Sequence, residues 1–144
     1  EIGGEVRVIG TNKKGNKWKI GIDRPISTNQ PGDDILAVIS LDNKAMATSG
    51  NYRSFFEYDD KEYSHIVDPR NGYALQSSIS SVSVVGPTCI DADALATALN
   101  VMSLDTGKSL IDSLDGFEAY WVIKQSDGRF RTESSKNMPI DVNL

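Results

Sequence analysis

The sequence predicts an α+β fold in which a mostly antiparallel sheet packs against two helices. Three observations carry this prediction. Strand-like runs outnumber helical segments along the 144 residues, most of these runs connect through hairpins, and two segments past the middle have helical spacing. Together these features are typical of one layered domain, and the chain is too short for two large ones.

The first strands are expected near the start of the chain. Residues 5–9 alternate polar and apolar side chains, as a half-buried strand does. Residues 18–22 resume the alternation after the turn-like stretch TNKKGNK, which predicts a hairpin between the two. Gly3 and Gly4 indicate a bulge, or the close approach of another chain or a ligand.

Loops and strands alternate in the next part of the chain. Residues 23–34 contain two prolines and no periodicity, which predicts a loop. The apolar run of residues 35–41 suits a buried strand. Residues 43–58 predict two strands separated by a break at residues 49–51, and the tripeptide DDK reverses the chain into a further strand at residues 62–67.

The second half combines strands with helices. Residues 68–78 read as a loop, and residues 79–86 as a β-branched strand. Residues 106–114 predict a short helix for which Thr106 is a plausible N-cap. Residues 117–124 predict the last strand, and a polar tail follows it.

The longer helix, from Asp91 to Ser103, has an unusual polar stripe. Its core face follows the i, i+3, i+4, i+7 spacing and contains Ala92, Leu95, Ala96, Leu99 and Met102. Asp93, Thr97 and Asn100 interrupt an otherwise apolar surface and line up along one side. An ionised carboxylate in such surroundings needs a hydrogen bond, an ion pair or a cation.

Composition excludes several classes of site. The net charge is −5 and the 15 Lys and Arg residues are scattered, which argues against a nucleic-acid surface. One cysteine and one histidine exclude an intramolecular disulfide and Cys- or His-rich metal sites. A metal would therefore be a hard ion held by oxygens, magnesium or calcium. Trp18 and Trp121 lie in strand-like runs and are expected in the core.

Asp93 and Thr97 are the first candidate site. A carboxylate and a hydroxyl four residues apart on a helix can both reach one magnesium ion. The alternatives are a capping role for Asp91 or Asp93 at the helix start, and a hydrogen bond from Thr97 to the carbonyl of Asp93.

Two further segments are weaker candidates. His65 lies near the end of a predicted strand, just before a Pro/Gly loop, where a general base could be presented. A neighbouring hydroxyl or Asp68 could equally satisfy it. The stretch ATSGNYR could expose backbone N–H groups to a phosphate, or could be an ordinary turn.

Taken in order, these segments resemble the ApbE family of FAD:protein FMN transferases. The matching stretches are EIGGEVR, WKIGID, ATSGNYR, YSHIVDPRNG and TCIDADALATAL, spread over residues 1–99 in the order of the family. The resemblance implies an ApbE-like fold related to the T-fold. Family members are longer, so residues 1–144 are expected to form the C-terminal part of a flavin transferase domain whose N-terminal half is absent.

The resemblance also implies roles for individual residues. Asp93 and Thr97 match the family's magnesium ligands, and a further ligand, a backbone carbonyl, is expected from the missing half. His65 and Asp93 are the expected catalytic residues, with His65 as base or proton relay. The residues expected to bind FAD are Gly3, Gly4, Glu5, Thr48, Ser49, Gly50, Ser64, His65 and Ile66.

The activity implied is magnesium-dependent cleavage of the FAD pyrophosphate, with transfer of FMN to a threonine or serine hydroxyl of a partner protein and release of AMP. Alternatives are an FAD pyrophosphatase that forms FMN and AMP, a non-catalytic FAD-binding module, and an inactive fragment. The expected partners are FAD and a flavin-acceptor protein, without nucleic acid. The expected location is the cell envelope, with membrane attachment only through an N-terminal lipid anchor outside these residues.

Overall fold

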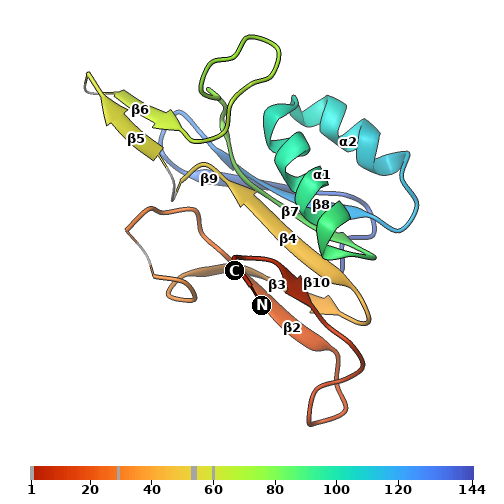
Figure 1. Cartoon of the computed structure of the whole chain (residues 1–144). Coiled ribbons are helices and arrows are strands. Elements are labelled where there is room, and N and C mark those ends of the chain that lie inside the picture. Colours follow the sequence, from red (N-terminus) through yellow and green to blue (C-terminus); the bar gives the residue numbers. More distant parts are fainter. Residues whose placement is uncertain (1, 29, 53–54, 60) are drawn as a thin grey trace.

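The computed structural model describes residues 2–28, 30–52, 55–59 and 61–144, which form ten strands and two helices (Figure 1). The strands are β1 (Val6–Arg7), β2 (Trp18–Asp23), β3 (Ile35–Leu41), β4 (Ala45–Gly50), β5 (Phe55–Tyr58), β6 (Lys61–Ser64), β7 (Ile79–Gly86), β8 (Glu118–Lys124), β9 (Phe130–Ser134) and β10 (Ile140–Asn143). The helices are α1 (Cys89–Val101) and α2 (Leu104–Asp112). The described strands pair antiparallel throughout, which confirms the predicted α+β class.

The elements form three layers around a central five-stranded sheet of order β1-β4-β7-β8-β9. Both helices cover one face of this sheet, and a three-stranded sheet of order β10-β3-β2 packs against the other (Figure 1). The β5–β6 hairpin projects away from the layers. Among the described residues, no helix is long and apolar enough to cross a membrane.

Alternation along the central strands creates two separate cores. On β8, Ala119 and Trp121 face the helices, whereas Tyr120 and Val122 face the three-stranded sheet. This follows from the period of two along a strand, which sends successive side chains to opposite faces. Strand β7, which the β-branched run predicted as a strand, lies in the middle of the sheet and is buried along its whole length.

The expected hairpin between residues 5–9 and 18–22 is wrong. Strand β1 is only two residues long and pairs with β4, whereas β2 pairs with β3. The physical reason is backbone hydrogen bonding: β3 is largely buried, so the N–H and C=O groups along both of its edges need partners, which β2 and β10 provide. The short β1 has too few residues to compete for that position.

Both helices begin two residues earlier than the sequence predicted. Helix α1 starts after Thr88, whose side chain caps it, and α2 starts after Ser103, whose hydroxyl oxygen accepts a hydrogen bond from the amide of Thr106. The proposed N-cap role of Thr106 is therefore wrong. Ser103 fits the cap position better because its extended backbone leaves its side chain free to turn back onto the helix.

The segment predicted as a polar tail contains two strands, β9 and β10. Because these strands are rich in polar residues, their sequences show little of the alternation of apolar and polar residues that is typical of strands. Each strand instead pairs with the edge of an existing sheet. The expectation for the tryptophans holds for Trp121, which is fully buried, and fails for Trp18, which is 39% exposed on the edge strand β2.

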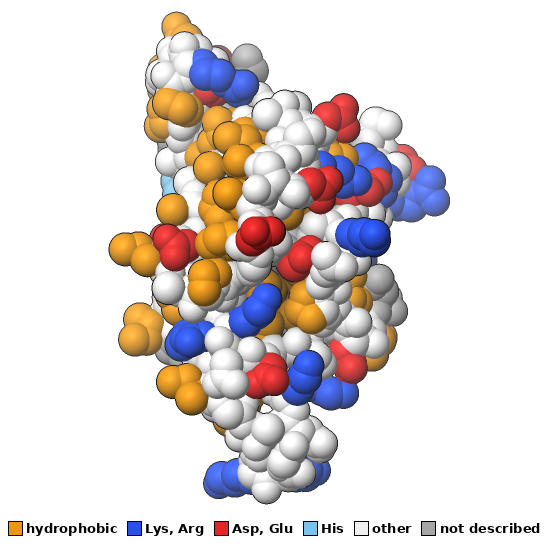
Figure 2. Space-filling view, turned by 90° about the vertical axis from the view of Figure 1, so that its right-hand side faces the viewer, with side chains coloured by type: hydrophobic (Ala, Val, Ile, Leu, Met, Phe, Trp, Pro, Cys, Tyr) orange, Lys and Arg blue, Asp and Glu red, His pale blue; other side chains and the backbone are white. Residues whose placement is uncertain are grey.

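On the face shown in Figure 2, acidic and basic side chains are interspersed.

Candidate functional site

A cavity of about 770 Å³ brings together most of the site residues that the sequence predicted. We call it the flavin cavity, after the ligand that the resemblance noted in the sequence leads us to expect there. Nine of those residues line it: Gly3, Gly4, Glu5, Thr48, Ser49, Gly50, His65, Asp93 and Thr97. Strand β2 and the following loop supply much of the remaining wall. Segments far apart in the sequence thus converge on one space. Glu1 and Arg53, which belong to the matching motifs, lie outside the described residues.

Gly3 and Gly4 form a tight turn at the cavity wall. The amide of Ile2 donates to the carbonyl of Glu5 at 3.0 Å, and the amide of Glu5 donates back to Ile2 at 3.1 Å. Gly3 and Gly4 have φ values of 63° and 102°, which L-residues with side chains rarely adopt. The two glycines are therefore a turn and not a bulge within a strand, and the absence of side chains leaves the backbone open to the cavity.

The end of β4 is fixed from both sides. The hydroxyls of Thr48 and Ser83 are 2.7 Å apart across the β4–β7 ladder. Behind them, the side-chain amide of Asn100 on α1 donates to the carbonyl of Ser49 at 3.2 Å. The predicted break at residues 49–51 is thus displaced, because Ser49 and Gly50 still belong to β4. These contacts hold the cavity-lining end of β4 against the helix.

Gly50 permits a close approach by an aromatic ring. A Cβ at this position would lie 2.8 Å from Cε1 of Tyr52 and 3.3 Å from the carbonyl oxygen of Ser80. Tyr52 lines the flavin cavity and also a second cavity beside it. Because the ring packs directly on Gly50, it forms part of the partition between the two cavities.

Asp93 and Thr97 reach the flavin cavity from the exposed side of α1. The capping role suggested as an alternative belongs to Asp91 instead. Its amide donates to the hydroxyl oxygen of Thr88 at 3.2 Å, and that hydroxyl donates to the Asp91 carboxylate at 2.6 Å. Within the described part of the chain, neither Asp93 nor Thr97 has a side-chain hydrogen bond or ion pair, so their oxygens are available to a ligand.

The side-chain oxygens of Asp93 and Thr97 are of the type that binds a hard cation, but they are too few to complete its coordination shell. A carboxylate and a hydroxyl are oxygen donors of the type that magnesium prefers. The described residues contain no group of three or more His, Cys, Asp or Glu side chains that could hold a metal. Asp93 and Thr97 can therefore supply part of an octahedral shell, with the remaining oxygens coming from phosphate, water or backbone.

His65 directly follows β6 and lines the flavin cavity. The loop after it is held by an ion pair that the sequence analysis did not identify. Arg70 donates to the Asp68 carboxylate through Nε at 2.8 Å and Nη2 at 2.6 Å, and the backbone amide of Arg70 donates to it at 2.9 Å. These hydrogen bonds from Arg70 lower the pKa of Asp68 to about 2.

The same arginine ties the loop to the helix that carries the candidate metal ligands. Nη2 of Arg70 donates to the carbonyl of Val101 at 3.2 Å, at the last residue of α1. A cation at a helix C-terminus also interacts favourably with the helix dipole. The position of His65 relative to Asp93 and Thr97 thus depends on this Asp68–Arg70 clamp. Its only signal in the sequence was the pairing of opposite charges on either side of Pro69.

Ser64 and Ile66 do not line the flavin cavity, so their assignment to it finds no support in the geometry. Ser64 is 8% exposed, faces the second cavity and accepts a hydrogen bond from the amide of Ile66 at 3.1 Å. Ile66 is 7% exposed and lines an adjoining groove. The chain bends at His65, directly after β6, and the hydrogen bond from the amide of Ile66 to the Ser64 hydroxyl spans this bend.

This adjoining groove, of about 650 Å³, is lined mainly by apolar side chains of α1 and of the loop after His65. It shares Ser49, His65 and Thr97 with the flavin cavity. A group that enters the groove therefore reaches the same side chains as a ligand bound in the cavity.

Comparison with known proteins places these features in a family. A sequence model of the ApbE family matches residues 1–121. The chain is 38% identical over 135 residues to the FAD:protein FMN transferase of Haemophilus influenzae, which covers 94% of this chain and 38% of that protein. It is 37% identical over 139 residues to the corresponding transferase of Vibrio cholerae, covering 96% of this chain and 40% of that protein.

Solved structures agree with the sequence comparison. The flavin transferase ApbE of Vibrio cholerae superposes with a TM-score of 0.76 at 34% identity, over 94% of this chain and 41% of that one. The ApbE protein of Thermotoga maritima gives a TM-score of 0.75 at 34% identity, over 94% and 41%. The chain spans about two fifths of the length of these relatives. From the match along the sequence and the agreement in fold, the chain belongs to the ApbE family.

Proposed function

We propose that this chain forms the part of a magnesium-dependent FAD:protein FMN transferase that binds the flavin and the metal ion. The observation that carries the proposal is the convergence of the two glycine-containing segments, His65, Asp93 and Thr97 on one cavity. The relatives named as FAD:protein FMN transferases support the same reaction class. The substrates are FAD and a protein with an acceptor threonine or serine.

In the proposed reaction, the acceptor hydroxyl oxygen attacks the phosphorus of the FMN half of FAD. A new phosphoester bond forms, the P–O bond of the pyrophosphate breaks, and AMP leaves with the bridging oxygen. His65 lines both the cavity and the groove, and would take the hydroxyl proton. The hydroxyl could reach this place through the groove while the dinucleotide fills the cavity.

Asp93 and Thr97 would hold magnesium through oxygen atoms. When bound, such an ion neutralises charge that develops on the phosphate oxygens during transfer. The chain's own contribution is to place a carboxylate and a hydroxyl one helical turn apart on an ordered helix, at the wall of the flavin cavity. Backbone amides near Gly3, Gly4 and Gly50 would orient the flavin.

The proposal is tested by measuring AMP release from FAD with magnesium, with and without a threonine-containing acceptor. Asp93→Asn should abolish release, because the neutral amide is a poor magnesium ligand. Asp112→Asn is the matched control, since Asp112 lies at the end of α2 and lines none of the three cavities. Equal loss in both variants, or full activity in Asp93→Asn, would contradict the proposed role.

The acceptor distinguishes the transferase from its alternatives. An acceptor that gains the mass of FMN identifies a transferase, whereas AMP and free FMN without that gain identify a pyrophosphatase. FAD that stays bound and uncleaved identifies a binding module. A cell-envelope location belongs to the same proposal and is supported by the family resemblance alone; fractionation of the source cells would test it.

A further inference from the structure

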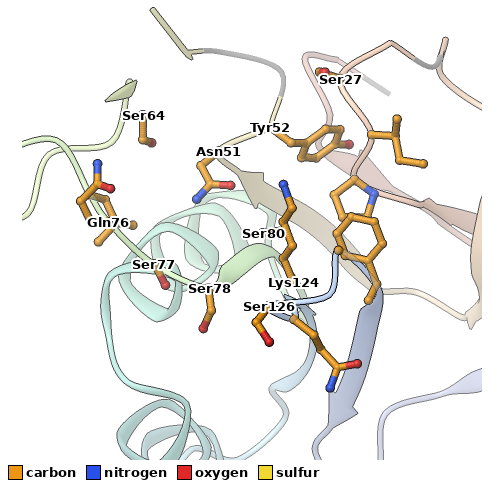
Figure 3. Close-up of a pocket in the computed structure, with 16 residues that line it drawn as sticks. Ser27, Asn51, Tyr52, Ser64, Gln76, Ser77, Ser78, Ser80, Lys124 and Ser126 are labelled. Carbon is orange, nitrogen blue, oxygen red and sulfur yellow. The ribbon is translucent and has the colours of Figure 1, made fainter. Parts of the chain in front are cut away.

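A second cavity, of about 740 Å³, is shown in Figure 3. It shares Tyr52 with the flavin cavity and differs from it in the side chains that line it. We call it the serine cavity, because six serines line it: Ser27, Ser64, Ser77, Ser78, Ser80 and Ser126. Side-chain amides of Asn51, Gln76 and Gln125 add to this wall. Its volume lies in the range of small-molecule sites. The proposed transfer reaction uses none of these side chains.

The charge of the serine cavity points to an anionic ligand. Lys124 is the only charged side chain among the described residues that line it, and no carboxylate faces it from those residues. Lys124 is anchored at the end of β8, where its backbone amide donates to the carbonyl of Ser78 at 2.8 Å. Its ammonium has no hydrogen bond or ion pair with any described residue, and the side chain extends into the cavity in Figure 3.

The surrounding hydroxyls can donate to the same anion. Ser64 and Ser77 accept hydrogen bonds from the backbone amides of Ile66 and Ile79, at 3.1 and 3.0 Å, which leaves their hydroxyl protons free. Ser80 is 7% exposed, so a ligand that accepts its proton would be shielded from water. Neutral hydroxyl donors that line the same cavity as an ammonium suit a phosphoryl group, which offers several acceptor oxygens.

The remaining wall can accommodate a ring. Pro25, Ile26, Leu75 and Phe130 contribute apolar surface to the cavity. Aromatic and apolar side chains bind the faces of nucleobases with little sequence preference. Tyr52, packed on Gly50, separates this space from the flavin cavity. A ligand with a phosphate at one end and a flat ring at the other matches both parts of the wall.

We propose that the serine cavity is a binding site for a nucleoside monophosphate, with Lys124 paired to the phosphate. The site is separate from the flavin cavity. AMP released in the proposed transfer is a natural source of such a ligand, and that source rests on the proposed function. Binding of a nucleoside monophosphate does not depend on the proposed function, since it requires neither FAD nor an acceptor protein.

The test is a titration of the full chain with AMP, adenosine and inorganic phosphate, without FAD or magnesium, followed by amide chemical shifts in NMR. We expect AMP to shift the resonances of residues 76–80 and 124–126 and to bind at least tenfold more tightly than adenosine. Lys124→Met should weaken AMP binding by about tenfold or more, the size of a charge-assisted hydrogen bond. Lys124→Arg should retain most of it.

Two controls assign the effect to this cavity. Lys136→Met removes an exposed lysine that lines none of the three cavities and should leave AMP binding unchanged. Asp93→Asn, which should abolish AMP release from FAD, should also leave it unchanged. Absence of AMP binding, equal binding of adenosine, or a loss in Asp93→Asn with none in Lys124→Met would each overturn the proposal. AMP binding in a chain that does not cleave FAD would support the site and contradict only the proposed function.

Discussion

At the scale of single residues, the site depends on small contacts behind the cavity wall. Asn100 is fully buried, and its amide nitrogen holds the carbonyl of Ser49 while its oxygen has no hydrogen-bond partner among the described residues. The sequence placed Asn100 on the same stripe as Asp93 and Thr97. In the structure Asn100 is buried against β4 and positions that strand, whereas Asp93 and Thr97 line the flavin cavity.

Asn100→Ala should therefore destabilise the chain by about 1–3 kcal/mol, because the partly buried carbonyl of Ser49 loses its donor. Asn100→Asp should cost more, since it places a carboxylate in an apolar core. Urea unfolding followed by circular dichroism measures both. Ser109→Ala, at an exposed position of α2, is the control and should change stability by less than about 0.5 kcal/mol. Equal stability of Asn100→Ala and the unchanged chain would show that the contact contributes little.

Gly50 gives a second prediction at this scale. Gly50→Ala should push Tyr52 out of the partition, because the added Cβ would lie 2.8 Å from its ring and 3.3 Å from the backbone of Ser80. Overpacking of this kind costs about 1–3 kcal/mol, and FAD affinity measured by flavin fluorescence should fall with it.

Gly107→Ala is the matched comparison for Gly50→Ala. A Cβ at Gly107 would approach Leu99 at 3.2 Å, in the core between the helices and β8 and outside the three cavities. It should alter stability without altering FAD affinity. The same loss of FAD affinity in both variants would mean that Gly50 acts only through overall stability.

At the scale of elements, α1 and the loop after β6 form one unit. Helix α1 packs Ala92, Ala96 and Leu99 against the central sheet and presents Asp93 and Thr97 to the flavin cavity. The Asp68–Arg70 clamp joins the loop to the C-terminal end of this helix. The helix start is fixed independently by Thr88 and Asp91.

The clamp predicts a pH dependence. The folded-state pKa of Asp68 is about 2, below the value of about 3.9 expected in the unfolded chain, so the clamp adds stability above about pH 4 and loses it as the pH falls toward 2. Arg70→Gln should raise the pKa of Asp68 toward its ordinary range, which NMR of the carboxyl carbon can measure. Arg129→Gln removes the partner of Asp127 instead and should leave Asp68 unchanged. An Asp68 that titrates identically in both variants would contradict the clamp.

Capping gives a further prediction for α1. Thr88→Ala removes the acceptor for the amide of Asp91 and should destabilise the chain by about 1 kcal/mol. Thr88→Ser keeps the hydroxyl and should restore most of the loss. Thermal unfolding measures both, and an unchanged Tm in Thr88→Ala would show that the cap is not needed for α1.

At the scale of the whole molecule, the three layers determine where the cavities lie. The flavin cavity opens where the end of β4, the edge strand β2 and helix α1 meet, so each of the three layers contributes to its wall. A ligand bound there contacts all of them and should stabilise the folded chain as a whole.

Ligand binding to the folded state alone raises stability by about 2.7 kcal/mol at a concentration one hundred times Kd. We therefore expect magnesium together with FAD to raise Tm, and EDTA to reverse the rise. Asp93→Asn should lose the magnesium-dependent part of the shift, and Asp112→Asn should keep it. A shift by magnesium that is equal in both variants would place the ion elsewhere.

The sequence alone determined the local periodicities and therefore most elements of the fold. The apolar run of β3, the β-branched run of β7 and the helical stripe of α1 each belong to a few neighbouring residues, and local propensity and burial decide them. The spacing of Asp93 and Thr97 on one helix face is equally local. Their common cavity with the glycine segments and His65 followed only through the family resemblance.

Tertiary structure decided which strands pair, which side of each segment faces which space, and which polar contacts are buried. Strand β1 pairs with β4 and not β2, Trp18 stays at an exposed edge, and Ser64 and Ile66 line other cavities than the flavin cavity. The serine cavity and the clamp by Arg70 also arise from residues distant in sequence or on neighbouring loops. Periodicity describes one element at a time, whereas pairing and cavities depend on the competition among all elements for burial.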